Sequence, residues 1–81
     1  MPTPSTSTLQ LDLRGLRCPL PLLRLKMQLA QLPAGSRLLA LSSDPGSAQD
    51  IPRFLAQAGH ELLAMSCQDE VWSFDLRKRL S

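Results

Sequence analysis

The sequence predicts an α/β (α+β) two-layer sandwich with the element order β-α-β-α-β-β, in which a mixed four-stranded sheet carries two helices on one face. Three observations lead to this fold class. Leucines alternate with polar residues near the N-terminus, leucines then recur at helical spacing, and the last third of the chain contains two short strand-like segments close together. A crossover helix between parallel strands is right-handed, which places both helices on the same face.

The first strand and the first helix are expected between residues 9 and 32. Residues 9–13 alternate between leucine and polar side chains, as in a strand with one face in water. An apolar helical stripe follows at Leu22, Leu25, Leu29 and Leu32. A proline and a glycine soon after this stripe predict that the helix ends there.

An interior strand and a second helix are expected next. Arg37–Ser42 is an almost continuous apolar run, which suits an interior strand. The second helix ends at Gly59, but its start is open, because Pro52 lacks a backbone N–H and disfavours a helical residue before it. Either the helix begins near Asp50, or it begins at Ser47 with a first turn distorted at the proline.

Two closing strands complete the domain. We expect them at residues 62–67 and 71–77, joined by a turn at residues 68–70 that lacks the glycine typical of a tight hairpin. Residues 1–7, which are rich in Pro, Ser and Thr, are expected to form a flexible tail. Residues 8–81 are then a single domain.

Length and composition exclude several classes of protein. The chain has 81 residues, a formal net charge of +2 and 43% hydrophobic residues, which suffices for one domain with an aliphatic core. Its apolar runs are far shorter than the roughly 20 residues of a transmembrane helix, and no secretory signal is recognisable. With two cysteines and no export signal, we expect a cytoplasmic monomer with reduced thiols rather than a disulfide-stapled scaffold.

Cys18 is the main candidate for chemistry, because it lies where a turn enters the first helix. A residue before proline favours extended backbone, which is the conformation of a helix N-cap. We therefore expect Cys18 at the N-cap and Pro19 as the first helical residue. Pro21 removes another N–H donor from the first turn. The two prolines should hold the sulfur in a fixed outward direction.

Positive charge near Cys18 predicts a partly ionised thiol. The helix N-terminus, together with Arg14, Arg17 and Lys26, would stabilise a thiolate and lower the pKa of Cys18 from about 8.5 toward 7. A cysteine at a helix start can equally be a small buried hydrophobic residue, and local sequence alone does not decide between the two.

The remaining candidates are more readily explained by structure than by chemistry. Cys67 closes an apolar segment and is expected to be a packed or edge residue, and no redox spacing supports a disulfide with Cys18. His60 follows a helix end and is expected to cap it or to lie at the surface. Asp44 and Asp50 look like turn and cap residues, with a catalytic carboxylate pair as the lesser alternative. A single histidine gives no metal-ligand cluster, and scattered glycines give no phosphate-binding loop.

Several short motifs match a known family in order and spacing. These motifs are Leu11-Asp12, Gly15-Leu16-Arg17-Cys18-Pro19-Leu20-Pro21, Asp44-Pro45, Asp50-Ile51-Pro52, Gly59-His60-Glu61-Leu62-Leu63 and Arg77-Lys78. Together they extend over residues 11–78, where the chain resembles the TusA/SirA-like family of small sulfur-carrier proteins. The resemblance implies the same β-α-β-α-β-β fold that the apolar pattern predicts.

The resemblance also implies a function and a set of site residues. Cys18 would carry sulfane sulfur as a persulfide. The sulfur would come from a cysteine desulfurase or another donor and pass to a downstream acceptor protein in tRNA thiolation, molybdenum-cofactor maturation or sulfur oxidation. Pro19 and Pro21 match the prolines of the family's Cys-Pro-x-Pro motif, and Lys26 falls where the family often has a basic residue. Such a sulfurtransferase-type carrier uses no metal or organic cofactor. Members assigned to tRNA 2-thiouridine synthesis typically have Glu between the two prolines, whereas this chain has Leu20, so the pathway stays open.

Two other classes of function remain alternatives. A non-catalytic interaction or regulatory module would keep the fold without an accessible thiol. A small RNA-binding domain would use the basic C-terminal residues. A net charge of +2 and the lack of an aromatic ladder do not favour direct nucleic-acid binding.

Overall fold

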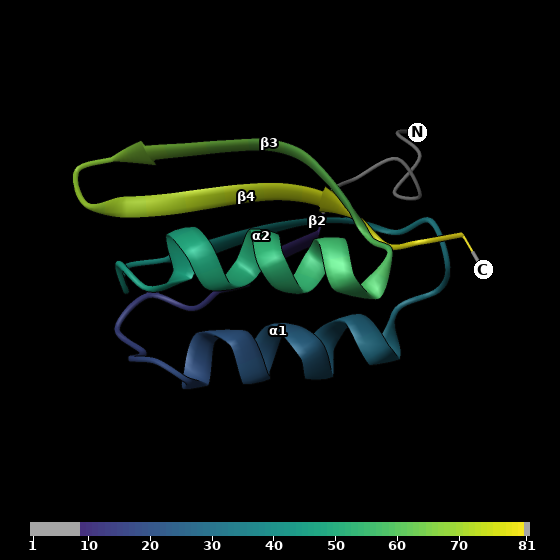
Figure 1. Cartoon of the computed structure of the whole chain (residues 1–81), viewed down its shortest axis with the longest axis horizontal. Helices are drawn as coiled ribbons and strands as arrows, with labels where there is room; N and C mark the ends of the chain where they lie inside the picture. The colour runs from purple at the N-terminus through teal and green to yellow at the C-terminus, as the bar shows by residue number, and fades with distance from the viewer. Residues whose placement is uncertain (1–8, 81) are drawn as a thin grey trace, which may run out of the picture.

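The computed structural model describes residues 9–80, which form four strands and two helices in the predicted order (Figure 1). The elements are β1 (Leu9–Asp12), α1 (Leu20–Gln31), β2 (Arg37–Ser42), α2 (Ser47–Ala58), β3 (Glu61–Gln68) and β4 (Val71–Arg77). The tail expected at residues 1–7, and the first and last residues of the domain expected at 8–81, lie outside the described residues.

The four strands form one mixed sheet in the order β1-β2-β4-β3. β1 pairs with β2 in parallel, and β4 pairs antiparallel with both β2 and β3. Figure 1 shows both helices on the same face of this sheet. The predicted two-layer fold class is therefore confirmed.

The core lies between the sheet and the helices. Each inner strand alternates, so that Leu38 and Ala40 of β2 and Phe74 and Leu76 of β4 face the helices and are fully buried. The other members of this buried cluster are Leu13, Leu25, Leu29, Ile51 and Leu55. Burying such a side chain contributes about 1.5–3 kcal/mol relative to leaving it exposed. The helical stripe predicted on α1 therefore faces the core, with its two inner leucines buried and its two outer ones partly buried.

The start of α2, which the sequence left open, lies at Ser47, and Pro52 is inside the helix. The Ser47 N–H donates to the Asp44 carbonyl at 3.0 Å, so the chain already turns before the helix begins. Ile51 and Leu55 flank the proline along the helix, and both are fully buried. Packing of these side chains favours a continuous helix despite the hydrogen bond that Pro52 cannot make.

The closing hairpin is tighter than the sequence indicated. β3 extends one residue further at each end than predicted, and only Asp69 and Glu70 remain between the strands. Their φ angles are 53° and 64°, so both occupy the left-handed region. This is the backbone of a two-residue hairpin turn, in which glycine or asparagine is more usual than glutamate.

The parallel pairing of β1 and β2 decides where the helices begin. Each of these strands is followed by a helix, and neighbouring parallel strands end at the same edge of a sheet. The loop before α1 and the loop before α2 therefore meet at one edge of the sheet. Within residues 9–80, neither helix has the length and hydropathy that crossing a membrane requires.

Candidate functional site

The segment between β1 and α1 holds Cys18 at the edge of the sheet where both helices begin. The Leu16 N–H donates to the Leu13 carbonyl at 3.2 Å and closes a tight turn. Gly15, at the centre of this turn, has φ +86°, a conformation that residues with a side chain rarely adopt. The Gly15 N–H donates to Ser43 Oγ at 2.9 Å, which ties the two loops together. The Cys18 thiol is free and exposed.

Two carboxylates from the start of α2 lie beside the Cys18 thiol. Cys18 Sγ lies 3.7 Å from Asp50 Oδ2 and donates its proton toward that oxygen. Asp44 reaches the same place, because a side chain added at Gly46 would meet the carboxylates of both Asp44 and Asp50. The environment of the sulfur is therefore negative.

This environment raises the pKa of Cys18 above its ordinary value. Partial shielding from water is the main cause, followed by the negative charges of Asp50 and Asp44 and the hydrogen bond to Asp50. The sequence-based prediction of a lowered pKa is wrong. The thiol of the free protein is mainly protonated at neutral pH.

The helix N-terminus does not act on the sulfur in the predicted way. Pro19, rather than Cys18, is the N-cap residue, and the cap makes no side-chain hydrogen bond. The Leu20 N–H donates to the Arg17 carbonyl at 2.8 Å rather than to the sulfur. The predicted Pro19 at the first helical position is corrected by one residue, since Leu20 begins α1. Pro21 lies in the first turn and is buried against the core.

The basic residues predicted around Cys18 are spread over different places. Arg14 forms an ion pair with Asp12 at 2.8 Å, which holds the pKa of that carboxyl at about 2. Arg17 lines an open crevice of about 450 Å³ together with Asp44, directly beside the cysteine loop. Lys26 lies further along α1, with its Nζ 5.2 Å from the centre of the Phe54 ring. The charges of Arg14 and Lys26 are thus directed to partners other than the sulfur.

The other two candidates, Cys67 and His60, are not among the groups that shift the pKa of Cys18. By strand register, Cys67 is level with Ser42 at the end of β2. Of the two expectations for Cys67, a packed residue or an edge residue, the structure favours the second: its thiol is free and exposed on β3, an edge strand of the sheet. His60 follows the left-handed Gly59 at the end of α2, and its N–H donates to the Leu55 carbonyl at 2.9 Å, so it caps the helix.

Asp50 is the site residue whose contact with Cys18 the sequence analysis missed. The two residues are 32 positions apart, so no local motif joins them. The signal that could have found the contact is the parallel order of the first two strands, which brings both helix starts to one edge. A polar residue in the first turn of α2 is then a natural neighbour of a residue just before α1.

The fold and the site together define a class of protein. It is a small two-layer domain that presents one exposed thiol at a helix start, in a loop fixed by backbone hydrogen bonds. Such a thiol is open to a reactive group that a partner protein brings to it.

The family can then be stated. Residues 9–78 match the family described as sulfurtransferase TusA. The chain belongs to this family, and the TusA/SirA-like resemblance of the sequence is confirmed.

Relatives and a solved structure agree with this membership. A putative sulfur carrier protein of Neisseria meningitidis serogroup A / serotype 4A is 48% identical over 63 residues, which are 78% of this chain and 85% of the relative. The sulfur carrier protein TusA of Pseudomonas syringae pv. syringae is 37% identical over 70 residues, covering 86% of this chain and 83% of the relative. The crystal structure of a SirA-like protein from Desulfitobacterium hafniense superposes with a TM-score of 0.78 at 24% identity, over 89% of this chain and 99% of that one, and shows the same fold. The names of these relatives support a sulfur-carrier role of the TusA type.

Proposed function

We propose that this protein carries sulfane sulfur on Cys18 as a persulfide, taken from a cysteine desulfurase or another donor and passed to an acceptor protein. The observation that carries the proposal is the exposed, free thiol of Cys18 in a loop held by the hydrogen bond from Gly15 to Ser43. Membership of the TusA family and relatives named as sulfur carriers support the same role. Because exposed free thiols survive best in a reducing compartment, we assign the transfer to the cytoplasm.

The transfer needs one thiolate and one persulfide, and it involves no net oxidation. The Cys18 thiolate attacks the outer sulfur of a donor persulfide. A new S–S bond forms at Cys18 while the donor's S–S bond breaks, and the donor cysteine leaves as a thiolate. Release repeats the exchange: the acceptor's thiolate attacks the outer sulfur, and Cys18 leaves as a thiolate. No metal or organic cofactor takes part in either step.

The carboxylates beside Cys18 give the resting carrier a protected thiol. A protonated thiol reacts slowly with peroxides and disulfides, because the thiolate is the nucleophile. A partner that brings a cationic side chain next to Asp50 and Asp44 would offset their charge and favour the thiolate. The thiol would then become reactive mainly when the correct partner is bound.

An apolar stripe on α1 offers a surface on which such a partner can dock. Leu20, Leu23 and Met27 are spaced three and four residues apart, so they share one side of the helix. They are 47%, 47% and 61% exposed. The stripe begins two residues after Cys18, and a docked partner would therefore lie next to the thiol. Leu20 puts an apolar side chain where family members of the tRNA pathway typically have Glu, which favours an apolar contact at this point.

Intact mass spectrometry after incubation with a cysteine desulfurase and free cysteine tests the proposal. The Cys67→Ser variant should gain the mass of one sulfur atom and lose it again on reduction. The Cys18→Ser variant keeps the other exposed thiol and serves as the matched control, so it should gain none. Equal loading of the two variants would contradict a carrier centred on Cys18.

A further inference from the structure

A second concave surface lies along the seam between the two helices, toward their C-terminal ends. It has a volume of about 390 Å³ and is lined by α1, α2, His60 and the segment after β4. Its apolar lining residues, which we call the floor, are Leu29, Ala30, Phe54 and Ala58. Ala30 lies about 15 Å along the helix axis from the start of α1, at a rise of about 1.5 Å per residue. The groove is therefore separate from the edge that carries Cys18.

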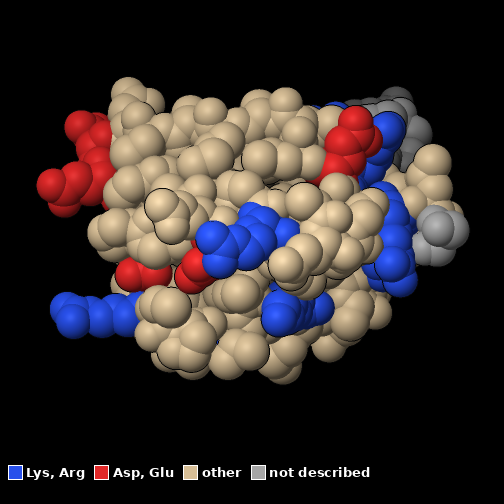
Figure 2. All heavy atoms as spheres, viewed as in Figure 1, with Lys and Arg blue, Asp and Glu red and all other residues tan. Residues whose placement is uncertain are grey.

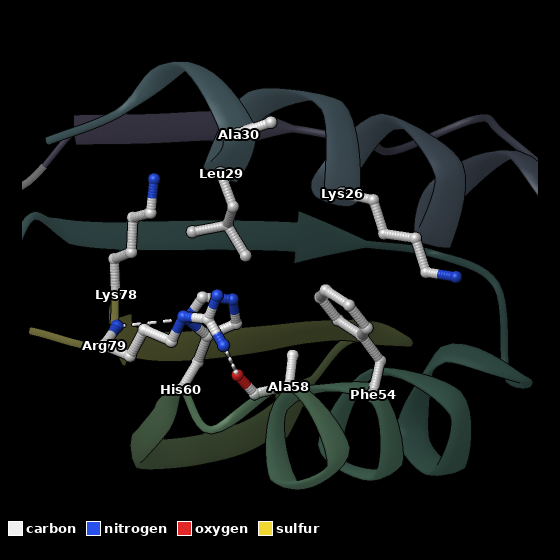
Figure 3. Close-up of a pocket in the computed structure, with 8 residues that line it drawn as sticks. All are labelled: Lys26, Leu29, Ala30, Phe54, Ala58, His60, Lys78 and Arg79. Atoms are coloured by element: carbon white, nitrogen blue, oxygen red, sulfur yellow. Dashed lines mark hydrogen bonds between the residues drawn. The ribbon is translucent and has the colours of Figure 1, made fainter. Parts of the chain in front are cut away.

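The rim of this groove is basic. Lys26, Lys78 and Arg79 are the basic residues of the lining, and none of the described residues that line the groove is acidic. The Lys78 Nζ also donates to the Leu32 carbonyl, so Lys26 and Arg79 are the more available cations. Figure 3 shows that the three cations come from different sides, with Lys26 next to Phe54 and Lys78 at the opposite end. In Figure 2, basic side chains lie over the helices and at the right-hand end of the same face, near the end of the chain.

Hydrogen bonds fix the side of the rim formed by His60 and Arg79. The backbone N–H of Arg79 donates to His60 Nδ1 at 3.0 Å, and Arg79 Nη1 donates to the Ala58 carbonyl at 3.0 Å (Figure 3). Neutral His60 therefore carries its proton on Nε2 and can act there only as a donor. The rim thus offers donors and positive charge around an apolar floor that is formed before any partner binds.

We propose that this groove binds a short acidic segment of a partner protein, with carboxylates on the basic rim and an apolar side chain on the apolar floor. The separation of the cations around the floor fits an extended segment better than one small anion. A single-stranded nucleic acid would need exposed aromatic rings for its bases. Phe54 is the one aromatic residue of the lining besides His60, and Lys26 already lies over it. The observations therefore favour an acidic peptide over RNA.

This docking site goes beyond the proposed sulfur transfer, because it needs neither the thiol nor sulfur. It would hold a partner on the helix-bearing face while Cys18, at the far end of α1, stays free to react. Contact at two separated points would also raise the effective concentration of the partner near the thiol.

Fluorescence anisotropy with a short labelled peptide of alternating Glu and Leu tests the proposal. The peptide should bind the unmodified protein, and affinity should fall as ionic strength rises, because exposed charges are screened. Lys26→Glu should weaken binding by about fivefold, as expected for reversing one exposed charge. Arg24→Glu, which makes the same change of charge on α1 outside the groove lining, should leave the affinity unchanged.

The NMR titration of His60, which lines the groove, provides a second test. The pKa of His60 lies below its ordinary value because of partial burial and the charges of Arg79 and Lys78. A bound carboxylate would offset those charges, so the His60 resonances should titrate at higher pH with peptide than without it. This NMR measurement does not depend on the stability of a variant.

Three results would overturn the proposal. One is the absence of peptide binding, and another is an equal effect of Lys26→Glu and Arg24→Glu. The third is tighter binding of an oligouridine RNA that Lys26→Glu abolishes, which would assign the groove to nucleic acid. Cys18→Ser should bind the peptide normally. Failure of sulfur loading and failure of this docking site are therefore distinguishable.

Discussion

The Cys18 thiol shows how the local environment of a side chain can reverse an expectation based on summed charge. Around this residue the sequence has more basic than acidic neighbours, yet Arg14 is held by Asp12 and Lys26 lies over Phe54. The group that does reach the sulfur is the Asp50 carboxylate, at 3.7 Å. Partial shielding from water, followed by the nearby carboxylates, raises the pKa of Cys18, whereas the basic residues are directed to other partners.

Replacing Asp50 with Asn should increase the reactivity of Cys18. The carboxylate disfavours the thiolate, so its removal lowers the pKa of Cys18 toward the ordinary value and increases the thiolate fraction below that pKa. We expect alkylation by iodoacetamide at pH 8 to be about twofold to fivefold faster, as the loss of one exposed charge interaction allows. Between pH 7 and pH 10, the ratio of the two rates should be largest at pH 7 and should become smaller as the pH rises.

The experiment is best done in the Cys67→Ser background, so that Cys18 is the one thiol that reacts. Asp69→Asn is the matched control, because Asp69 lies in the hairpin turn and does not contribute to the pKa shift of Cys18. An alkylation rate in Asp50→Asn equal to or below that of the control would show that the carboxylate does not restrain the thiol.

At the scale of elements, periodicity predicted most of the fold. The alternating leucines of β1, the leucine stripe of α1 and the apolar run of β2 all lie where the pattern puts them, because burial of one face dictates each pattern. What periodicity could not supply was backbone detail that tertiary packing decides. The continuous start of α2 through Pro52 and the glycine-free turn at Asp69 and Glu70 depend on buried neighbours and paired strands rather than on local preference.

The sequence predicted the candidate site only in part. Cys18 was identified from its place between a turn and a helix, and the structure leaves it exposed. Asp50 was missed as its partner, because a contact across 32 residues becomes visible only after the strand order is known. The groove on the helix layer was missed for a similar reason, since Lys26, His60 and Arg79 come from three separate segments.

The exposed apolar stripe of α1 predicts a variant that separates docking from chemistry. Leu23→Glu places a charge in the middle of the stripe without touching Cys18 or the buried side of the helix. If the stripe contacts the sulfur donor, this variant should load sulfur from a cysteine desulfurase about tenfold more slowly, in line with about 1.4 kcal/mol lost at one contact residue. Its alkylation by iodoacetamide, which needs no protein contact, should be unchanged.

Leu63→Glu provides the matched control for that variant. Leu63 is 39% exposed and lies on β3, so the same change of side chain is made on another element. Equal slowing by both substitutions, or none by Leu23→Glu, would argue against the stripe as the docking surface for the donor.

Over the whole molecule, a group of acidic side chains and a group of basic side chains lie toward opposite ends of the helices, and the net charge does not reveal this separation. Carboxylates flank the thiol where both helices begin, and cations line the groove toward the helix ends. Because these groups nearly cancel in the sum of +2, composition alone gave no sign of either region. Both regions are built on the same two helices, and their geometry therefore depends on one shared core.

That shared core predicts cooperative loss of the whole structure. Leu25 of α1 is fully buried against the sheet, so Leu25→Ala removes packed methyl groups and should lower the free energy of unfolding by about 2–5 kcal/mol. Urea unfolding can be followed both by far-UV circular dichroism and by fluorescence of Trp72, a β4 residue packed against the core. The two transitions should coincide, and should shift together in the variant, because small domains with one core unfold in a single step. Two separate midpoints would mean that the helix layer unfolds independently of the sheet, and that the thiol and the groove do not share a common support.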